Sequence, residues 1–172
     1  CHSFPCAKCL LVNKAFIHND PDDYHDSKLT LHDCITDKIS FKNNVLSFNF
    51  SDGFWVTPEH EASSVSNTVR TDGAQVDFEI EHDDFFEIYL DVFRKRWFCK
   101  KTVECWELDE LIKAFDSGKY QLEFIYQYRT HFEQMWQCML HYKGCWYAEC
   151  QLHIPHCTAT YRWNNLREEC VW

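Results

Sequence analysis

Apolar and polar residues alternate with a period of two along most of the chain, the pattern of half-buried β-strands. Around residue 78, for example, Val76, Phe78 and Ile80 alternate with Asp77 and Glu79. Short turn signals, such as Asn43-Asn44 and Lys143-Gly144, separate the alternating runs and favour antiparallel hairpins. The strands predicted in this way cover residues 35–41, 45–50, 75–81, 85–92, 97–106, 120–129, 133–142 and 146–154, with a weaker strand at 158–163.

One segment follows a different period. Leu108, Leu111, Ile112 and Phe115 recur at the spacing of a single helical face, and Gly118 follows where a helix would end. The sequence therefore predicts one amphipathic helix over about 107–117. We expect an α+β fold, a curved antiparallel sheet or half-barrel of about eight strands covered by this helix.

The two ends of the chain differ from its periodic body. Residues 1–28 include a polar, acidic stretch and are predicted to be an N-terminal tail or appended segment. Residues 29–163 are then a single domain and residues 164–172 a C-terminal tail. A second irregular stretch, the mostly polar residues 57–73, is predicted to be a long loop.

Charge and cysteine content limit the classes of partner. The formal net charge is −10, which disfavours nucleic acid and anionic membrane surfaces, because both are bound mainly through Lys and Arg. The chain also has no apolar run of 18 residues. Several of its eleven cysteines lie in apolar runs, and buried free thiols are typical of a reducing cytoplasm, which is the predicted compartment. Disulfides in a secreted protein are the alternative.

Acidic residues are concentrated between Asp72 and Asp91, where no Lys or Arg occurs. If neighbouring strands present them on one face, they form a docking surface for a basic protein. A solvated outer face with cross-strand ion pairs is the alternative. The predicted protein-binding residues are Asp77, Glu79, Glu81, Asp83, Asp84 and Glu87.

Two further sites are weighed as alternatives. The pair Cys6 and Cys9 has the spacing of half a zinc site, and Cys150 with His153 is the best second pair. Against this site, a spacing of three on a strand puts Cys150 and His153 on opposite faces. A ligand cavity lined by aromatic side chains is the other alternative, and its residues are Tyr126, Tyr128, Trp136 and Tyr142.

No catalytic residue is nominated, because the sequence has no nucleophile elbow and no glycine-rich phosphate loop. No cofactor is expected unless the alternative zinc site exists.

The body from Leu29 to Ile154, with "SDGFW", "ELDELIKAFDSGKYQLEFIYQYR" and "YAECQLHI", resembles small bacterial proteins of unknown function. That resemblance assigns no role to any residue. In size, acidity and single-helix, β-rich layout the chain is also similar to immunity proteins of bacterial toxin systems, which implies a non-enzymatic inhibitor. We therefore expect a domain that binds another protein, and a small-ligand- or zinc-binding β-barrel-like protein is the alternative.

Overall fold

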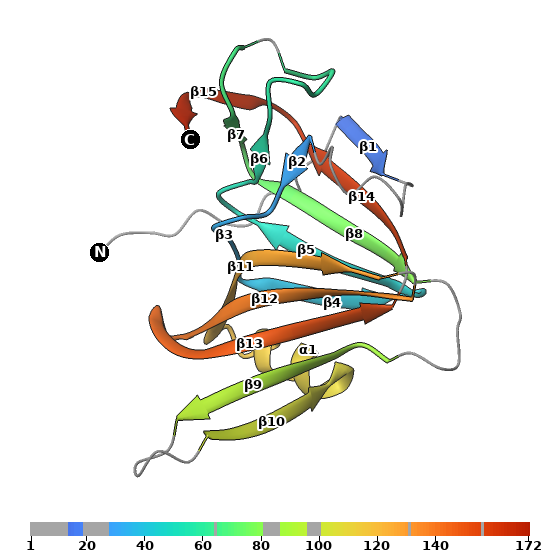
Figure 1. Ribbon diagram of the computed structural model, residues 1–172, viewed down its shortest axis with the longest axis vertical. Coiled ribbons are helices and arrows are strands. Elements are labelled where there is room, and N and C mark those ends of the chain that lie inside the picture. The colour runs from blue at the N-terminus through green and yellow to red at the C-terminus, as the bar shows by residue number, and fades with distance from the viewer. Residues whose placement is uncertain are drawn as a thin grey trace.

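Three antiparallel sheets make up most of the structure, a computed structural model shown in Figure 1. Of the residues that it describes, 65% are strand and 7% are helical. The predicted α+β class with a half-barrel of about eight strands is therefore wrong, and the fold is mostly β. The described residues are 14–18, 28–63, 65–80, 87–95, 101–130, 132–155 and 157–172.

The largest sheet has six strands in the order β10-β9-β13-β12-β11-β3. Its three central strands are long and joined by hairpins. The turn at Lys143 and Gly144, with φ of 51° and 75°, is the left-handed pair that a two-residue hairpin loop requires. The strands are β3 (Cys34–Thr36), β9 (Tyr89–Lys95), β10 (Lys101–Glu107), β11 (Tyr120–Arg129), β12 (Glu133–Tyr142) and β13 (Cys145–Pro155).

A five-stranded sheet in the order β1-β14-β8-β5-β4 packs against part of the first. Phe48 and Phe50 of this sheet contact Phe124 of the six-stranded sheet edge to face, with ring centroids 5.4 and 5.6 Å apart. The strands are β1 (Lys14–His18), β4 (Lys38–Lys42), β5 (Val45–Phe50), β8 (Ala74–Ile80) and β14 (Cys157–Trp163).

The third sheet is small and lies at the end of the molecule that carries the C-terminus (Figure 1). Its four strands are in the order β15-β7-β6-β2. They are β2 (Leu29–Thr30), β6 (Trp55–Val56), β7 (Val69–Thr71) and β15 (Leu166–Val171). Strands β1 and β15 thus fall within the two segments predicted to be tails.

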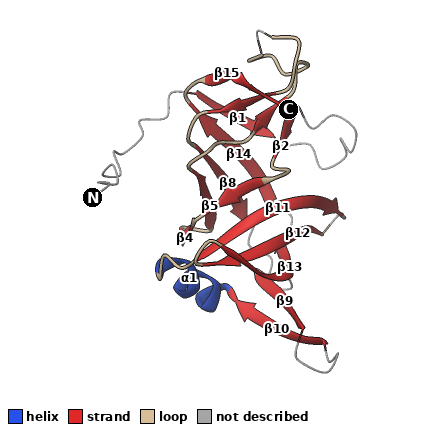
Figure 2. Cartoon of the chain, turned by 90° about the vertical axis from the view of Figure 1, so that its left-hand side faces the viewer, coloured by secondary structure: helices blue, strands red, loops and turns tan. Residues whose placement is uncertain are grey.

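The predicted helix is confirmed as α1 (Leu108–Asp116). Leu111 and Phe115 are buried in the same core as the inner residues of the sheets. Figure 2 shows α1 on one side of the six-stranded sheet, beside β9, β10 and β11. The inner face of that sheet is therefore covered by α1 and by the five-stranded sheet. No helix in the described part of the chain is long and apolar enough to cross a membrane.

The segment 57–73, predicted as one polar loop, contains a strand and an ordered turn. Strand β7 occupies residues 69–71. In the turn, the backbone N–H of Ala62 donates to Nδ1 of His60 at 3.0 Å, and the His60 ring lies edge-on to Trp163 with 5.8 Å between centroids. Burial lowers the pKa of His60, although neighbouring Glu61 acts in the opposite direction.

Protonation of His60 should destabilise the fold. Because its folded-state pKa is below the ordinary 6.5, the unfolded chain takes up the proton first and stability falls as pH falls through 6.5. Protonating Nδ1 also removes the acceptor for the Ala62 N–H, which costs about 1 kcal/mol. We expect His60→Asn, whose side-chain oxygen keeps the acceptor, to reduce the loss of unfolding free energy between pH 7.5 and about 5. Equal pH profiles for variant and parent in denaturant titrations would contradict this.

Candidate functional site

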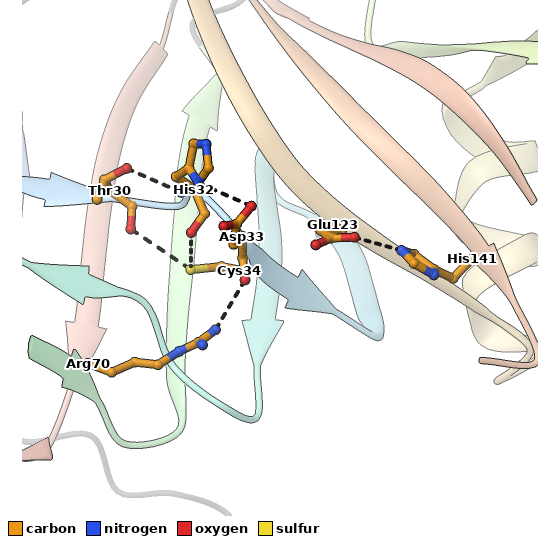
Figure 3. A network of polar contacts seen from close by, with 7 residues as sticks. All are labelled: Thr30, His32, Asp33, Cys34, Arg70, Glu123 and His141. Atoms are coloured by element: carbon orange, nitrogen blue, oxygen red, sulfur yellow. Dashed lines mark hydrogen bonds and ion pairs between the residues drawn. The ribbon is translucent and has the colours of Figure 1, made fainter. Parts of the chain in front are cut away.

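The polar network around Cys34 joins the small sheet to the edge of the six-stranded sheet (Figure 3). The Cys34 thiol faces the backbone oxygens of His32 and Thr30, at 3.4 and 3.9 Å. The ring nitrogen Nδ1 of His32 lies 3.1 Å from the Asp33 carboxylate, and the Arg70 guanidinium donates to the backbone carbonyl of Asp33 at 3.4 Å. Burial raises the pKa of Cys34 to about 12, more than Arg70 lowers it. This thiol lacks the adjacent base and lowered pKa of a nucleophile, so the network connects strands rather than activating sulfur.

The cysteines should accordingly fall into two classes of reactivity. Cys138 and Cys150 lie opposite each other on β12 and β13, both buried, and burial raises the pKa of Cys138 well above its usual value. Cys105 and Cys145 are exposed, although desolvation and the neighbouring Asp91 raise the pKa of Cys105. At pH 8, a thiol with the pKa of Cys34 carries about a thousandfold less thiolate than an ordinary one. Peptide mapping after brief iodoacetamide treatment should find Cys145 and Cys105 modified. Equally rapid modification of Cys34, Cys138 and Cys150 would contradict the burial described here.

The two described members of the alternative zinc site do not come together. Cys150 points to the inner face of β13 beside Cys138. His153 lies on the outer face, stacked on Tyr89 with ring centroids 4.4 Å apart. This confirms the geometric objection from strand alternation, and Cys6 and Cys9 lie outside the described residues. Among the described residues, no three His, Cys, Asp or Glu side chains are grouped closely enough to hold a metal ion.

The predicted acidic face is divided between two sheets. Strand β8, with Asp77 and Glu79, belongs to the five-stranded sheet, whereas Glu87 precedes β9 of the six-stranded sheet. Asp77 is nearly buried and accepts from Ser47, Gln75 and Arg162. Of the three described members of the set, Glu79 and Glu87 are exposed, and Glu81, Asp83 and Asp84 lie outside the described residues. Strand alternation indicates which side chains share a face, but it does not identify the partner strand.

The four predicted cavity residues also diverge, because a bulge changes the alternation of β11. The pairing of β11 with β12 shifts between Phe124 and Tyr126. Tyr126 and Tyr128 therefore leave the inner face and are 54% and 51% exposed, while Trp136 remains inside. Tyr142 packs at the hairpin end, 5.0 Å from Tyr120 between ring centroids. No shared cavity is formed by these four side chains.

The residues that the bulge redirects belong to a broader surface on the outer face of the six-stranded sheet. Strand pairing arranges this surface in three rows that cross the strands. The first row is Tyr128, Met135, His153, Tyr89 and Glu107. The middle row is Tyr126, Gln137, Gln151, Asp91 and Cys105. The third row is Ile35, Glu123, Met139, Glu149, Phe93 and Val103. We call these three rows the outer face.

Exposed apolar groups are concentrated on this side of the molecule. The described part of the chain has nine large exposed apolar side chains. Four of them, Ile35, Val103, Tyr126 and Tyr128, belong to the outer face, and Trp146 adjoins it opposite His141. Ile35 and Val103 lie at opposite ends of the third row, and the half-buried Met139 and Phe93 between them extend the apolar surface across the sheet. Singly scattered apolar residues are ordinary on a surface, whereas a group spread over one face favours an interaction site.

The outer face also carries four carboxylates, Asp91, Glu107, Glu123 and Glu149, and none of its three rows contains Lys or Arg. The Glu123 carboxylate lies 2.8 Å from His141 (Figure 3), whereas Glu107 and Glu149 are exposed and have no ion pair within the described chain. The alternation in the sequence predicts the strands but does not reveal this surface. Its only sequence signal is apolar residues at the polar positions of the alternation, such as Phe93, Val103 and Met135.

Comparisons with models of protein families, with curated proteins and with solved structures found no match. The proposed function therefore rests on the geometry of the chain itself.

Proposed function

We propose that the protein is a non-enzymatic binding domain that docks another protein on the outer face. The observation that carries this proposal is the concentration of exposed Tyr, Val and Ile side chains on a sheet face whose opposite side is already covered by α1 and the five-stranded sheet. Tyrosine is enriched in protein interfaces, because its ring contributes large contact area at low entropic cost.

The face is also held in a fixed shape, as a docking surface needs. Its backbone is part of a continuous antiparallel ladder from β10 to β3. His153 is stacked on Tyr89 and lies 3.7 Å from Glu133, and His141 is paired with Glu123. Such contacts limit the conformational entropy that ordering side chains on binding would cost. A toxin-neutralising inhibitor in a reducing cytoplasm is one concrete form of this function.

The proposal is tested by site-specific photo-crosslinking in the native host. A photoreactive residue replaces Gln137, at the middle of the outer face, or Asn49, on the five-stranded sheet, as the control. We expect a discrete partner to be crosslinked from position 137 and not from position 49.

The partner identified in this way is then purified and its Kd measured. Tyr126→Ser combined with Tyr128→Ser should weaken binding by tenfold or more, about 1.4 kcal/mol. The control, Phe41→Ser, changes an exposed ring on β4 and should leave Kd unchanged. Crosslinking without preference for position 137, or equal losses from both variants, would refute the proposed docking surface.

A further inference from the structure

The charge of the outer face restricts what can occupy it. The four carboxylates flank or interrupt an otherwise uncharged strip of tyrosines, methionines and glutamines. A partner that covered them with an apolar or acidic surface would leave desolvated carboxylates unpaired, at a cost in affinity. A second copy of this chain is disfavoured for the same reason, since it would bring two sets of four carboxylates together.

Two arginines elsewhere in the chain show how a cation lies beside both an aromatic ring and a carboxylate. Arg94 lies over the ring of Tyr147, 4.8 Å from its centroid, and pairs with Glu104 at 3.0 Å. Arg70 lies over Trp55 at 4.9 Å and pairs with Asp52 at 3.4 Å. In both cases a guanidinium lies over an aromatic ring while one of its terminal nitrogens pairs with a carboxylate, an arrangement for which arginine is better suited than lysine.

The same components are present, without the arginine, on the outer face. The exposed ring of Tyr126 lies on β11 one row from Glu123, with the His32 ring edge-on to it at 5.6 Å between centroids, and the exposed ring of Tyr128 lies one row further away. Asp91 stands next to Cys105, which ends the middle row at β10. From β11 to β10 the middle row crosses five strands, a span of roughly 19 Å at about 4.8 Å per strand. An extended segment of about six residues covers that distance.

We infer that the occupant of the outer face is an arginine-bearing segment of a basic protein, which crosses the strands along the middle row. Its guanidinium groups stack on Tyr126 and Tyr128 and pair with the flanking carboxylates. This inference rests on the proposed function and names the chemistry of the partner.

Four synthetic peptides of equal length and sequence test it, with every variable position occupied by arginine, lysine, citrulline or glutamate. Citrulline is the matched control, because it keeps the planar shape of arginine without the charge. Each peptide is titrated into the full-length chain, and binding is followed by amide chemical shifts and calorimetry. We expect the arginine peptide to shift resonances of Tyr126, Gln137 and Gln151, and to bind about tenfold more tightly than the citrulline peptide. The lysine peptide should bind between the two.

Variants of the chain test whether Tyr126 and Tyr128 bind the arginine peptide. Tyr126→Ser with Tyr128→Ser should reduce the affinity for the arginine peptide to that for the lysine peptide, and Phe41→Ser should not change it. Equal binding of the arginine and citrulline peptides at the outer face overturns the inference but leaves the proposed function intact. Shifts centred on Glu79 and Glu87, or no shifts on the outer face, also overturn the inference. The crosslinking experiment then decides the proposed function separately.

Discussion

Replacing Gly53 by alanine should destabilise the protein by about 3–5 kcal/mol, the largest loss that we expect from any single added methyl group. Gly53 follows β5 in a tight turn, has φ of +76°, and donates its N–H to the Phe50 carbonyl at 3.1 Å. A Cβ atom at this position would lie less than 3.0 Å from the carbonyl oxygens of Thr71 and Asp72 and from the Thr71 hydroxyl. These are backbone atoms and a bonded side chain, so they cannot move aside independently.

The clash is costly because two hydrogen bonds to the backbone of Phe54 hold Thr71 in place. Its N–H donates to the Phe54 carbonyl at 2.8 Å, and its hydroxyl accepts from the Phe54 N–H at 3.0 Å. Relieving the overlap would break the pairing of this turn with β7.

The matched control is Gly144→Ala, at φ of +75° with no atom within 4 Å of the added Cβ. It measures the left-handed backbone cost alone, about 1 kcal/mol. Denaturant titrations give the unfolding free energy of both variants. Agreement within about 1 kcal/mol would show that the close approach of Gly53 to β7 is absent.

Asp77→Ala should cost about 2–4 kcal/mol of stability. Although it lies in the acidic stretch of the sequence, Asp77 is nearly buried on β8. Its carboxylate accepts from Ser47 and Gln75, both at 2.6 Å, and from Arg162 at 2.9 Å. Truncation therefore leaves three donors without their acceptor. The Arg162 side chain is 39% exposed, so water recovers part of the loss.

Glu79→Ala is the control on the same strand, because Glu79 projects from the same side but is exposed. We expect it to change stability by less than about 0.5 kcal/mol. Equal effects of the two substitutions in thermal or chemical unfolding would mean that Asp77 has the solvated position of a surface carboxylate.

Local pattern predicted local structure well in this chain. The apolar stripe from Leu108 to Phe115 identified α1, and alternation located the three long strands β11, β12 and β13 within a residue or two. The turn at Asn43-Asn44 is also confirmed, with both residues at positive φ. These elements depend on neighbours in sequence, which is the information that periodicity carries.

The shortest strands, the partner of each strand and the β11 bulge could not be predicted in the same way. Strands β2, β3, β6 and β7 are only two or three residues long, too short to show a period. The separation of β8 and β9 into different sheets, which divided the predicted acidic face, depends on partners that alternation does not specify. The bulge in β11 reversed the faces of Tyr126 and Tyr128 by one extra residue. Because the candidate site depends on which strands pair and on the bulge in β11, it could be recognised only in the folded chain.

The most direct test of the docking surface is the association rate of the crosslinked partner, measured by stopped flow at about 20 and about 300 mM salt. Glu107→Gln with Glu149→Gln removes two exposed charges from the outer face, and Glu79→Gln with Glu87→Gln removes two exposed charges from the acidic stretch of the sequence. We predict that the first pair slows association about tenfold at low salt and reduces its salt dependence, while the second has little effect. The reverse ranking, or equal rates for both variants and the parent, would contradict the assignment of the outer face.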